Sequence, residues 1–530
     1  MPLTASEHRL VDSAASWFDA NRERFVKELC DLIRYPSVAA ESDPSPKPGE
    51  PYGHEVRRVF DHMIDKAACD GFHARDYDGH VLEVAYPQDD VETDDDIAFV
   101  GHLDVVPAGP GWTHDAFEPR VVGDGDIVIG RGALDDKGVS LVNYNLLRFF
   151  NERGHCFRHR VRMLFGGSEE PALNDIKWFV RNVGAPHQAI VTDGPFPVNN
   201  IQKGLLDVDV ALPVSERLRG WHAGSSANTI PAVASIDLSG MDVDEVRQAL
   251  EHCDLDDDTR RRITITPSDD ADGVDNGGVT VTAHGISGHA SKPDGTINAI
   301  ALLTSVLAKS GLLDGRDAAA AEAIAAWAGD PYGGTLGFAF DNTESGPTTS
   351  NLGIVMPGPE FGTDTEGRAV PSDAIVMHLD IRYAVGQTDE DILAAIRRHV
   401  KPLDGRLVNV LNDDPYYVPD GDSRVELLTG AYNDVINGMA PDTPQARPVA
   451  MGGGTHARFI PDALNFGPEF HAEYVPSVDG IVMDPPDCIA PGTGSAHGID
   501  EWVSIRNLRA AFVMYALGLV RLDQYLDGRD

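Results

Sequence analysis

The sequence has few features of secreted, membrane or disulfide-bonded proteins. Its five cysteines are scattered over 530 residues without a CxxC pair, which argues against a disulfide framework and a cysteine-based zinc site. The N-terminus shows no apolar segment typical of secretory signals, and no apolar run reaches the ~18 residues of a membrane span. We therefore expect a cytoplasmic protein with reduced thiols.

Basic residues are scarce as well. Lys and Arg number 43, only nine of them lysine, against 84 Asp and Glu, so the formal net charge is −41. A surface this negative repels phosphate groups, and we expect neither nucleic acid nor an anionic membrane as a partner. The hydrophobic share of 42% is a globular value, which excludes a mainly disordered chain.

The first part of the chain alternates helix and strand patterns. We expect a first helix over residues 13–35, strands over 97–101, 160–165 and 189–192, and helices between them over 138–150 and 173–182. This alternation is typical of an α/β domain with a mostly parallel central sheet flanked by helices. A final amphipathic helix is expected to begin after Ser504.

The pattern changes after Lys203. Period-two alternation predicts antiparallel strands there, including a hairpin over residues 263–285, with helices over 243–252, 299–309, 318–328 and 389–400. The sequence thus predicts a second domain of α+β type with an antiparallel sheet.

Residues that can bind metals gather at the ends of the predicted strands. His102 and Asp104, in GHLDVVP, follow one strand, and residues i and i+2 of an extended chain point the same way. Asp135 precedes a helix in GRGALDDKG, and Glu169 and Glu170 follow a strand in LFGGSEEP. Taken singly, each motif is better explained as a structural pair, a helix cap or first-turn acids.

Two further candidate residues favour a metal site over these structural explanations. Asp193, in IVTDGPFPV, directly follows a strand, and His497 lies in GSAHGIDEW before the last helix. In an open α/β sheet, ligands bind outside the carboxyl ends of the strands, where these residues gather. Two histidines and several carboxylates suit Zn²⁺, Mn²⁺ or Co²⁺ better than copper, and the number of acids indicates two ions sharing one carboxylate.

In this order, the segments resemble the co-catalytic metallopeptidases of the M20 family, and the resemblance extends from Pro36 to the final helix. Within that family the chain is most similar to the PepV-like dipeptidases. The subgroup resemblance rests on TDGPFPVNNIQKG, GISGHASKPDGTINA, LGFAFDNTESGPTTSNLGI and GGGTHAR.

The resemblance implies a dinuclear metal centre. His102 and Asp193 would hold one ion, Glu170 and His497 would hold the other, and Asp135 would bridge both. Zn²⁺ is the expected ion, with Mn²⁺ or Co²⁺ as alternatives.

It also implies roles for residues that do not bind metal. Asp104 would orient the nearby metal-binding histidine, and Glu169 would act as general base and then protonate the leaving amine. His289, in SGHAS, would polarise the scissile carbonyl with assistance from Asn228. Arg458 would bind the C-terminal carboxylate of the substrate.

Other residues keep a structural interpretation. Asp136 and Lys137 are expected to fix a helix start, and His456 to be structural. The 26 residues between Phe470 and His497 are more than we expect in the PepV-like group, and could cover the rim of the cleft.

The predicted organisation is a metal-binding catalytic domain of residues 1–203 and 445–530, with an inserted lid domain of residues 204–444 that binds substrate, in a monomer. The predicted activity is hydrolysis of dipeptides with free termini through a metal-activated water and a Glu general base. An N-acyl amino acid amidase of the same fold is the alternative. A noncatalytic binding protein is disfavoured because Glu169 is retained.

Overall fold

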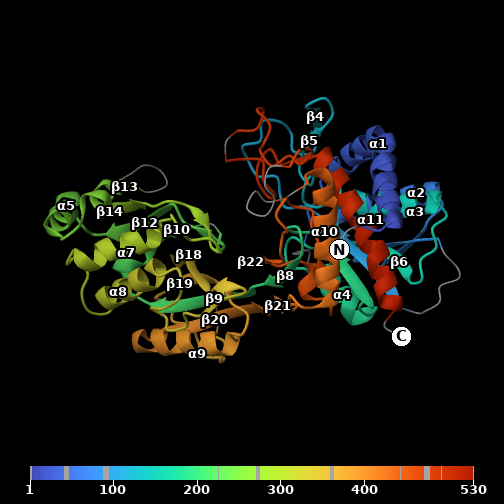
Figure 1. Ribbon diagram of the computed structural model, residues 1–530. Coiled ribbons are helices and arrows are strands. Elements are labelled where there is room, and N and C mark those ends of the chain that lie inside the picture. The colour runs from blue at the N-terminus through green and yellow to red at the C-terminus, as the bar shows by residue number, and fades with distance from the viewer. Residues whose placement is uncertain are drawn as a thin grey trace. The chain divides into compact units, whose positions relative to one another are not determined.

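The computed structural model describes residues 3–40, 47–87, 95–224, 226–269, 275–358, 363–441, 443–470, 478–490 and 492–528. The chain divides into two compact units (Figure 1). Unit 1 comprises Met1–Asn200, Tyr417–Val449 and Thr455–Asp530. Unit 2 comprises Ile201–Tyr416 and Ala450–Gly454.

A nine-stranded sheet has most of its strands in unit 1. Its strand order is β1-β2-β6-β3-β7-β23-β8-β21, with β22 paired to β8. The strands are β1 (His73–Tyr77), β2 (Val81–Ala85), β3 (Asp96–His102), β6 (Arg160–Gly166), β7 (Gln188–Val191), β8 (Asn199–Gln202), β21 (Tyr416–Tyr417), β22 (Val449–Met451) and β23 (Leu464–Asn465).

The centre of this sheet is parallel. β3 pairs in parallel with both β6 and β7, and β7 pairs in parallel with β23, whereas β1, β2 and β6 pair antiparallel. Every residue of β3 is buried, as expected for a strand covered on both faces. The predicted α/β class is therefore confirmed, with an antiparallel edge that the sequence analysis did not predict.

Six α-helices of unit 1 accompany this sheet: α1 (Ala5–Ile33), α2 (His54–Asp70), α3 (Lys137–Glu152), α4 (Asn174–Asn182), α10 (Ser423–Met439) and α11 (Ile505–Asp527). α1 begins with a capping box between Thr4 and Glu7, and Ser504 caps α11 as predicted. A small sheet of β4 (Arg120–Val122), β5 (Ile127–Ile129) and β24 (Trp502–Ser504) lies beside the start of α11.

Aromatic side chains join α1, α3 and α11. The ring of Trp17 stacks on Phe512 at 5.4 Å between centroids, and Phe149 contacts both rings edge-on at 5.9 and 5.6 Å. The indole N–H of Trp17 donates to Glu152 at 2.6 Å. The first and last helices of the chain are therefore held in one core.

Unit 2 contains an eight-stranded antiparallel sheet in the order β13-β14-β12-β10-β18-β19-β9-β20. These strands are β9 (Gly204–Pro213), β10 (Gly220–Ala223), β12 (Val233–Ser239), β13 (Ile263–Asp269), β14 (Asp275–His284), β18 (Thr349–Pro357), β19 (Ala374–Tyr383) and β20 (Arg406–Asp413). The predicted hairpin is the β13–β14 pair.

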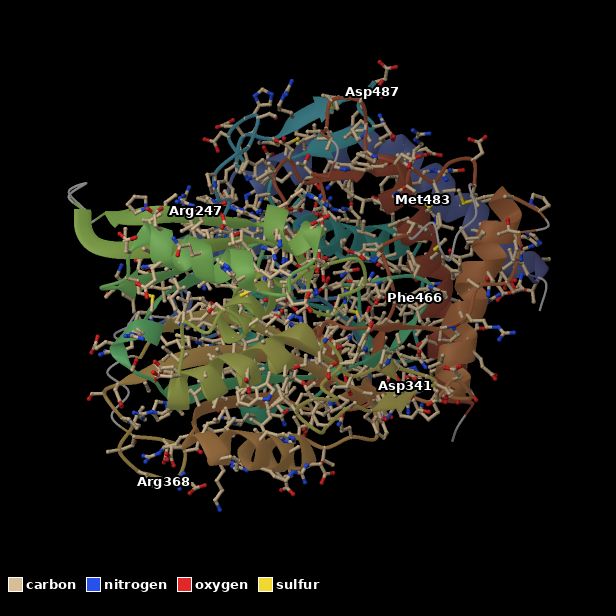
Figure 2. All side chains as sticks on the ribbon, turned by 90° about the vertical axis from the view of Figure 1, so that its left-hand side faces the viewer. Arg247, Asp341, Arg368, Phe466, Met483 and Asp487 are labelled. Atoms are coloured by element: carbon tan, nitrogen blue, oxygen red, sulfur yellow. The ribbon has the colours of Figure 1, made fainter. Side chains whose placement is uncertain are left out.

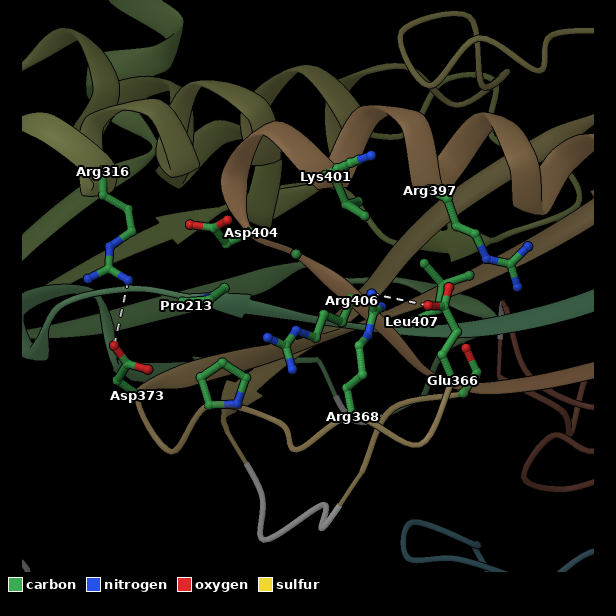
Figure 3. Close-up of a pocket in the computed structure, with 14 residues that line it drawn as sticks. Pro213, Arg316, Glu366, Arg368, Asp373, Arg397, Lys401, Asp404, Arg406 and Leu407 are labelled. Carbon is green, nitrogen blue, oxygen red and sulfur yellow. Dashed lines mark ion pairs between the residues drawn. The ribbon is translucent and has the colours of Figure 1, made fainter.

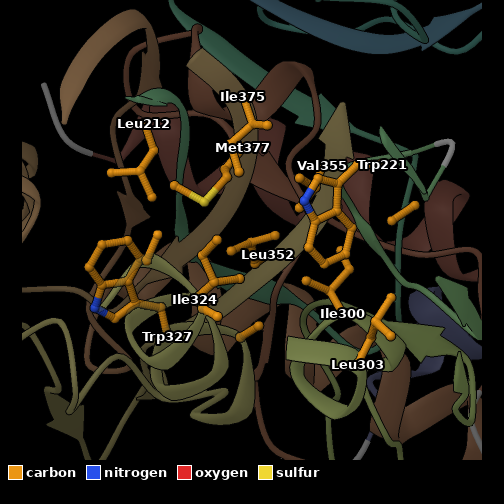
Figure 4. Packing of buried hydrophobic residues seen from close by; sticks show 14 of the residues in the cluster. Leu212, Trp221, Ile300, Leu303, Ile324, Trp327, Leu352, Val355, Ile375 and Met377 are labelled. Atoms are coloured by element: carbon orange, nitrogen blue, oxygen red, sulfur yellow. The ribbon is translucent and has the colours of Figure 1, made fainter. Parts of the chain in front are cut away.

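Helices pack on this sheet around two tryptophans. The helices of unit 2 are α5 (Val243–His252), α6 (Asp257–Arg261), α7 (Ala299–Lys309), α8 (Gly315–Gly329) and α9 (Asp389–Val400). Trp221 and Trp327 are buried with Ile300, Ile324 and Met377 in the core shown in Figure 4. Two short ribbons complete the unit, β11 (Thr229–Ile230) with β15 (Gly288–His289) and β16 (Asp341–Asn342) with β17 (Gly346–Pro347).

Two long helices are absent from the prediction. The apolar residues of α2 recur at helical spacing (Val56, Val59, Phe60, Met63 and Ala67), so the sequence did contain its signal. α10 packs against α11 in unit 1, whereas the predicted lid domain of residues 204–444 includes α10. Within the described residues, no helix is long and apolar enough to cross a membrane.

Candidate metal centre

Three parallel strands carry four of the predicted site residues. His102 is the last residue of β3, Glu169 and Glu170 follow β6, and Asp193 follows β7. Because β3 pairs with both neighbours, the carboxyl ends of these strands meet at one edge of the sheet. One ligand atom from each of His102, Glu169 and Asp193 lies within 4.8 Å of the others.

Asp135 lies between the two histidines. Its Oδ1 is 3.1 Å from His102 Nε2, and its Oδ2 is 3.0 Å from His497 Nε2. His497 Nε2 is also 2.8 Å from Glu170 Oε2, while His102 Nε2 is 3.9 Å from Asp193 Oδ2. Asp135 thus directs one oxygen to each histidine, and each histidine has a further carboxylate beside it.

The buried carboxylate of Asp104 connects three parts of the site. Its Oδ1 lies 3.3 Å from His102 Nδ1 and accepts the backbone N–H of Glu169 at 3.1 Å. Its Oδ2 accepts the backbone N–H of Glu170 at 3.1 Å. One side chain therefore positions the histidine ring and both glutamates, as carboxylates behind metal-binding histidines commonly do.

Glu501 and Arg131, both buried, support the loop of Asp135 and are missing from the predicted site. Glu501 Oε1 accepts the backbone N–H groups of Leu134 and Asp135 at 2.9 and 3.1 Å, and its Oε2 pairs with Arg131 at 2.6 Å. Arg131 also donates to the carbonyl of His497 at 3.1 Å. Arg131 lies in the motif GRGALDD and Glu501 in the motif AHGIDEW, but only the fold brings the two motifs together.

Asp136 and Lys137 hold the surrounding backbone. The Asp136 side chain accepts the backbone N–H of His102 and the hydroxyl of Ser140, each at 3.0 Å. Asp136 is the N-cap residue of α3, as expected for a residue that fixes the helix start, but its side chain makes no capping hydrogen bond to the helix backbone. Lys137 donates to the carbonyl of Tyr35 at 2.6 Å. Both side chains are buried, and each fixes a loop of the site.

The electrostatics of the cluster reflect crowded acids. Burial and the neighbouring Asp135 raise the pKa of Asp193 to about 8 and that of Glu170 to about 7. Burial also raises the pKa of Glu169 well above its usual range. Although burial opposes it, hydrogen bonds to both histidines hold the pKa of Asp135 low, and hydrogen bonds to Asp135 and Glu170 raise the pKa of His497 to about 11.

These residues fit divalent metal ions. Glu170 Oε1 is buried and has no hydrogen-bond partner among the described residues, so it is an acceptor that a cation would satisfy. Imidazole nitrogens and carboxylate oxygens are the donors that Zn²⁺ and Mn²⁺ accept. Two sets of three such residues converge, His102 with Asp135 and Glu170, and His102 with Glu169 and Asp193.

Residues 98–520 match peptidase family M20/M25/M40. The chain belongs to this family. The match spans most of the chain and confirms both the resemblance and the prediction of a peptide-bond hydrolase.

Two relatives of similar length are named as dipeptidases. A Bacillus subtilis protein named "Putative dipeptidase YtjP" is 24% identical over 512 residues, covering 94% of this chain and 97% of the relative. A Staphylococcus saprophyticus protein also named as a putative dipeptidase is 26% identical over 476 residues, covering 86% and 92%.

Solved structures show the same fold. Human carnosine dipeptidase 1 matches with a TM-score of 0.55 at 14% identity, over 99% of this chain and 100% of that chain. The di-peptidase Dug1p from Saccharomyces cerevisiae matches with a TM-score of 0.54 at 14% identity, over 97% and 98%. These likenesses confirm the M20 fold.

Arg458, the residue that the M20 resemblance assigns to the substrate carboxylate, ends the short 3₁₀ turn His456–Arg458 in unit 1. His456 in the same turn is buried, and its Nε2 lies 3.1 Å from Asp175 Oδ1. The ring of His456 is 6.2 Å from that of His102 between centroids. This turn therefore adjoins the metal-ligand cluster.

The two site residues predicted in unit 2 are neighbours in space, although 60 residues separate them. His289 of β15 pairs with Thr229 of β11, and the N–H of Ala290 donates to the carbonyl of Asn228 at 2.8 Å. The backbone N–H of Ser291 donates to His289 Nδ1 at 3.1 Å. Nδ1 is thus an acceptor, and the neutral ring carries its proton on Nε2.

Unit 2 also contains a hollow of about 690 Å³ that includes none of the predicted site residues (Figure 3). Basic side chains such as Arg397, Lys401 and Arg406 line it, and two further lining residues, Arg316 and Arg368, form ion pairs with Asp373 and Glu366. Among the described residues, its lining contains no histidine or cysteine, so it does not resemble the metal-ligand cluster of unit 1.

Proposed function

We propose that this M20 protein is a dinuclear metal-dependent dipeptidase that hydrolyses dipeptides with free termini. The observation that carries the proposal is the position of Asp135, with one carboxylate oxygen beside each of His102 and His497. A shared carboxylate between two separate ligand sets is the arrangement that a two-metal site requires. The names of the relatives in Bacillus and Staphylococcus agree with the substrate class.

In this proposal His102 and Asp193 hold one ion, Glu170 and His497 hold the other, and Asp135 binds both. When bound, the ions supply Lewis acidity that makes a water more acidic and polarises the scissile carbonyl. Zn²⁺ is the proposed ion because borderline nitrogen and oxygen donors suit it, and Mn²⁺ or Co²⁺ are alternatives.

Glu169 is proposed as the general base. Its carboxylate lies within the cluster, and Asp104 fixes its backbone, so it can take a proton from the attacking water and return it to the leaving amine.

Three residues are proposed to act on the substrate. His289 would donate its Nε2–H to the scissile carbonyl oxygen, and Asn228, its neighbour across the β11–β15 ribbon, would assist. Arg458 would bind the C-terminal carboxylate through its planar guanidinium. The proposed assembly is a monomer, with both units supplied by one chain.

The test is hydrolysis of free dipeptides and of matching N-acetyl amino acids, each with Zn²⁺, Mn²⁺ and Co²⁺. We expect cleavage of the free dipeptides, and a loss of kcat of about a hundredfold or more in Glu169→Gln. Glu322→Gln on the exposed face of α8 is the matched control and should retain full activity. Cleavage of the acetylated compounds alone would assign the protein to the amidase alternative.

A further inference from the structure

An apolar cavity of about 360 Å³ lies within unit 1. Its walls come from separate parts of the chain and include Leu134, Phe470, Val482, Met483, Pro485 and Trp502. Cavities of this size and lining are typical of small-ligand sites. None of the described residues that line it has a role in the proposed metal centre.

The cavity adjoins three loops of the metal-ligand cluster. Leu134 and Ala496 line it, and they directly precede two proposed metal ligands, Asp135 and His497. Glu469 also lines it, and its backbone N–H donates at 2.9 Å to the carbonyl of Gly194. Gly194 directly follows Asp193, a third proposed metal ligand. The cavity therefore lies against the loops that carry these three proposed ligands.

One wall includes Val482, Met483 and Pro485, which lie in the connection between Phe470 and His497. Figure 2 labels Met483 and Asp487 in this connection. The side chain of Asn507 on α11 accepts the N–H of Val482 at 2.8 Å and donates to its carbonyl at 2.6 Å.

The same connection has a second anchor. Buried Ile489 packs with Ile127 and Ile129 of β5, and with the partly buried Trp502 of β24. The wall is thus fixed at two points, by hydrogen bonds at Val482 and by apolar packing at Ile489. A fixed wall gives the cavity a defined shape.

We propose that this cavity receives an apolar side chain from the N-terminal residue of the dipeptide. The inference rests on the proposed function. Arg458 is the proposed partner of the C-terminal carboxylate, and it does not line the cavity. We therefore assign the cavity to the residue at the other end of the substrate, the N-terminal one. Burial of a leucine-sized side chain in such a lining is favourable, and the carboxylate of Glu469 disfavours acidic side chains.

The experiment compares kcat/KM for Leu-Gly, Gly-Leu and Gly-Gly in the wild type and in Met483→Trp. Met483 is partly exposed, so the larger ring can enter the cavity without disturbing the core. We expect the Leu-Gly to Gly-Gly ratio to fall about tenfold or more, while the Gly-Leu to Gly-Gly ratio stays unchanged. Leu411→Trp, on an exposed strand position of unit 2, is the control and should change neither ratio.

Each other outcome has a definite meaning. Unchanged ratios in Met483→Trp, or a fall for Gly-Leu instead, would overturn the assignment while leaving the dipeptidase proposal intact. Absence of dipeptide cleavage by the wild type would overturn the proposed function and this inference with it. If Met483→Trp does not fold, Pro485→Phe at an exposed position of the same wall tests the same ratios.

Discussion

Asp104 and Glu501 each hold the backbone of a different loop of the metal-ligand cluster. Each is a fully buried carboxylate whose oxygens accept backbone N–H groups from a loop that carries proposed metal ligands. Asp104 could be predicted because it stands two residues from His102 on an extended chain. Glu501 could not, because its partners Leu134 and Asp135 lie more than 360 positions away along the chain.

At this scale we predict that Glu501→Gln destabilises the protein by about 3 kcal/mol. The amide can still accept from the backbone with its oxygen, but its NH₂ group then faces Arg131 and leaves a buried cation unpaired. Urea unfolding with fluorescence detection measures the change in the free energy of unfolding.

Glu366→Gln is the matched control for that substitution. Glu366 pairs with Arg368 at 3.1 Å, but both side chains are more than half exposed, so its loss should change the free energy of unfolding by less than about 1 kcal/mol. Equal changes in the free energy of unfolding for the two substitutions would show that the buried Arg131–Glu501 pair stabilises the protein no more than the exposed pair does.

At the scale of elements, the sequence predicted best the helices and strands that have a clear apolar pattern of their own. The strands β3, β6 and β7 are short apolar runs, and the helices α3, α7 and α9 have apolar residues at helical spacing. The structure places all six within one or two residues of the predicted bounds. The antiparallel edge strands β1 and β2 were not predicted, because their place follows from the pairing of β2 with β6 and of β1 with β2, and not from their own pattern.

The core between α1, α3 and α11 leads to a second stability prediction. Phe512→Ala should cost about 3–5 kcal/mol, since the ring is fully buried and its removal leaves a cavity against Trp17 and Phe149. Phe512→Leu, which refills most of that space, should cost clearly less. Thermal unfolding followed by circular dichroism compares the two variants, and a smaller loss for Ala than for Leu would contradict the packing described.

For the whole molecule, charge is the dominant property. A formal charge of −41 creates repulsion among surface carboxylates that opposes the compact state. Networks such as Arg148 with Glu28 and Asp70 offset this locally, but 43 basic residues cannot pair with 84 acids. The sequence composition alone was enough to establish this feature, which the fold does not alter.

We therefore predict that added NaCl stabilises the protein. Raising the salt from about 0.1 M to about 1 M shortens the screening length from about 10 Å to about 3 Å, so repulsion between surface carboxylates weakens. The midpoint of thermal unfolding should rise by several degrees. The measurement is made with a chelator present, so that metal binding does not contribute, and a constant or falling midpoint would contradict the prediction.

The pairing of the first and last helices also determines the order in which the chain can fold as it is synthesised. Unit 2 is almost entirely one continuous stretch, Ile201–Tyr416, and most of it has left the ribosome while unit 1 still lacks α10 and α11. At common translation rates the remaining residues take on the order of ten seconds to add. During that interval the apolar face of α1 that will meet Phe512 has no partner from α11. The N-terminal half of this peptidase therefore completes its core only after α11 has been synthesised.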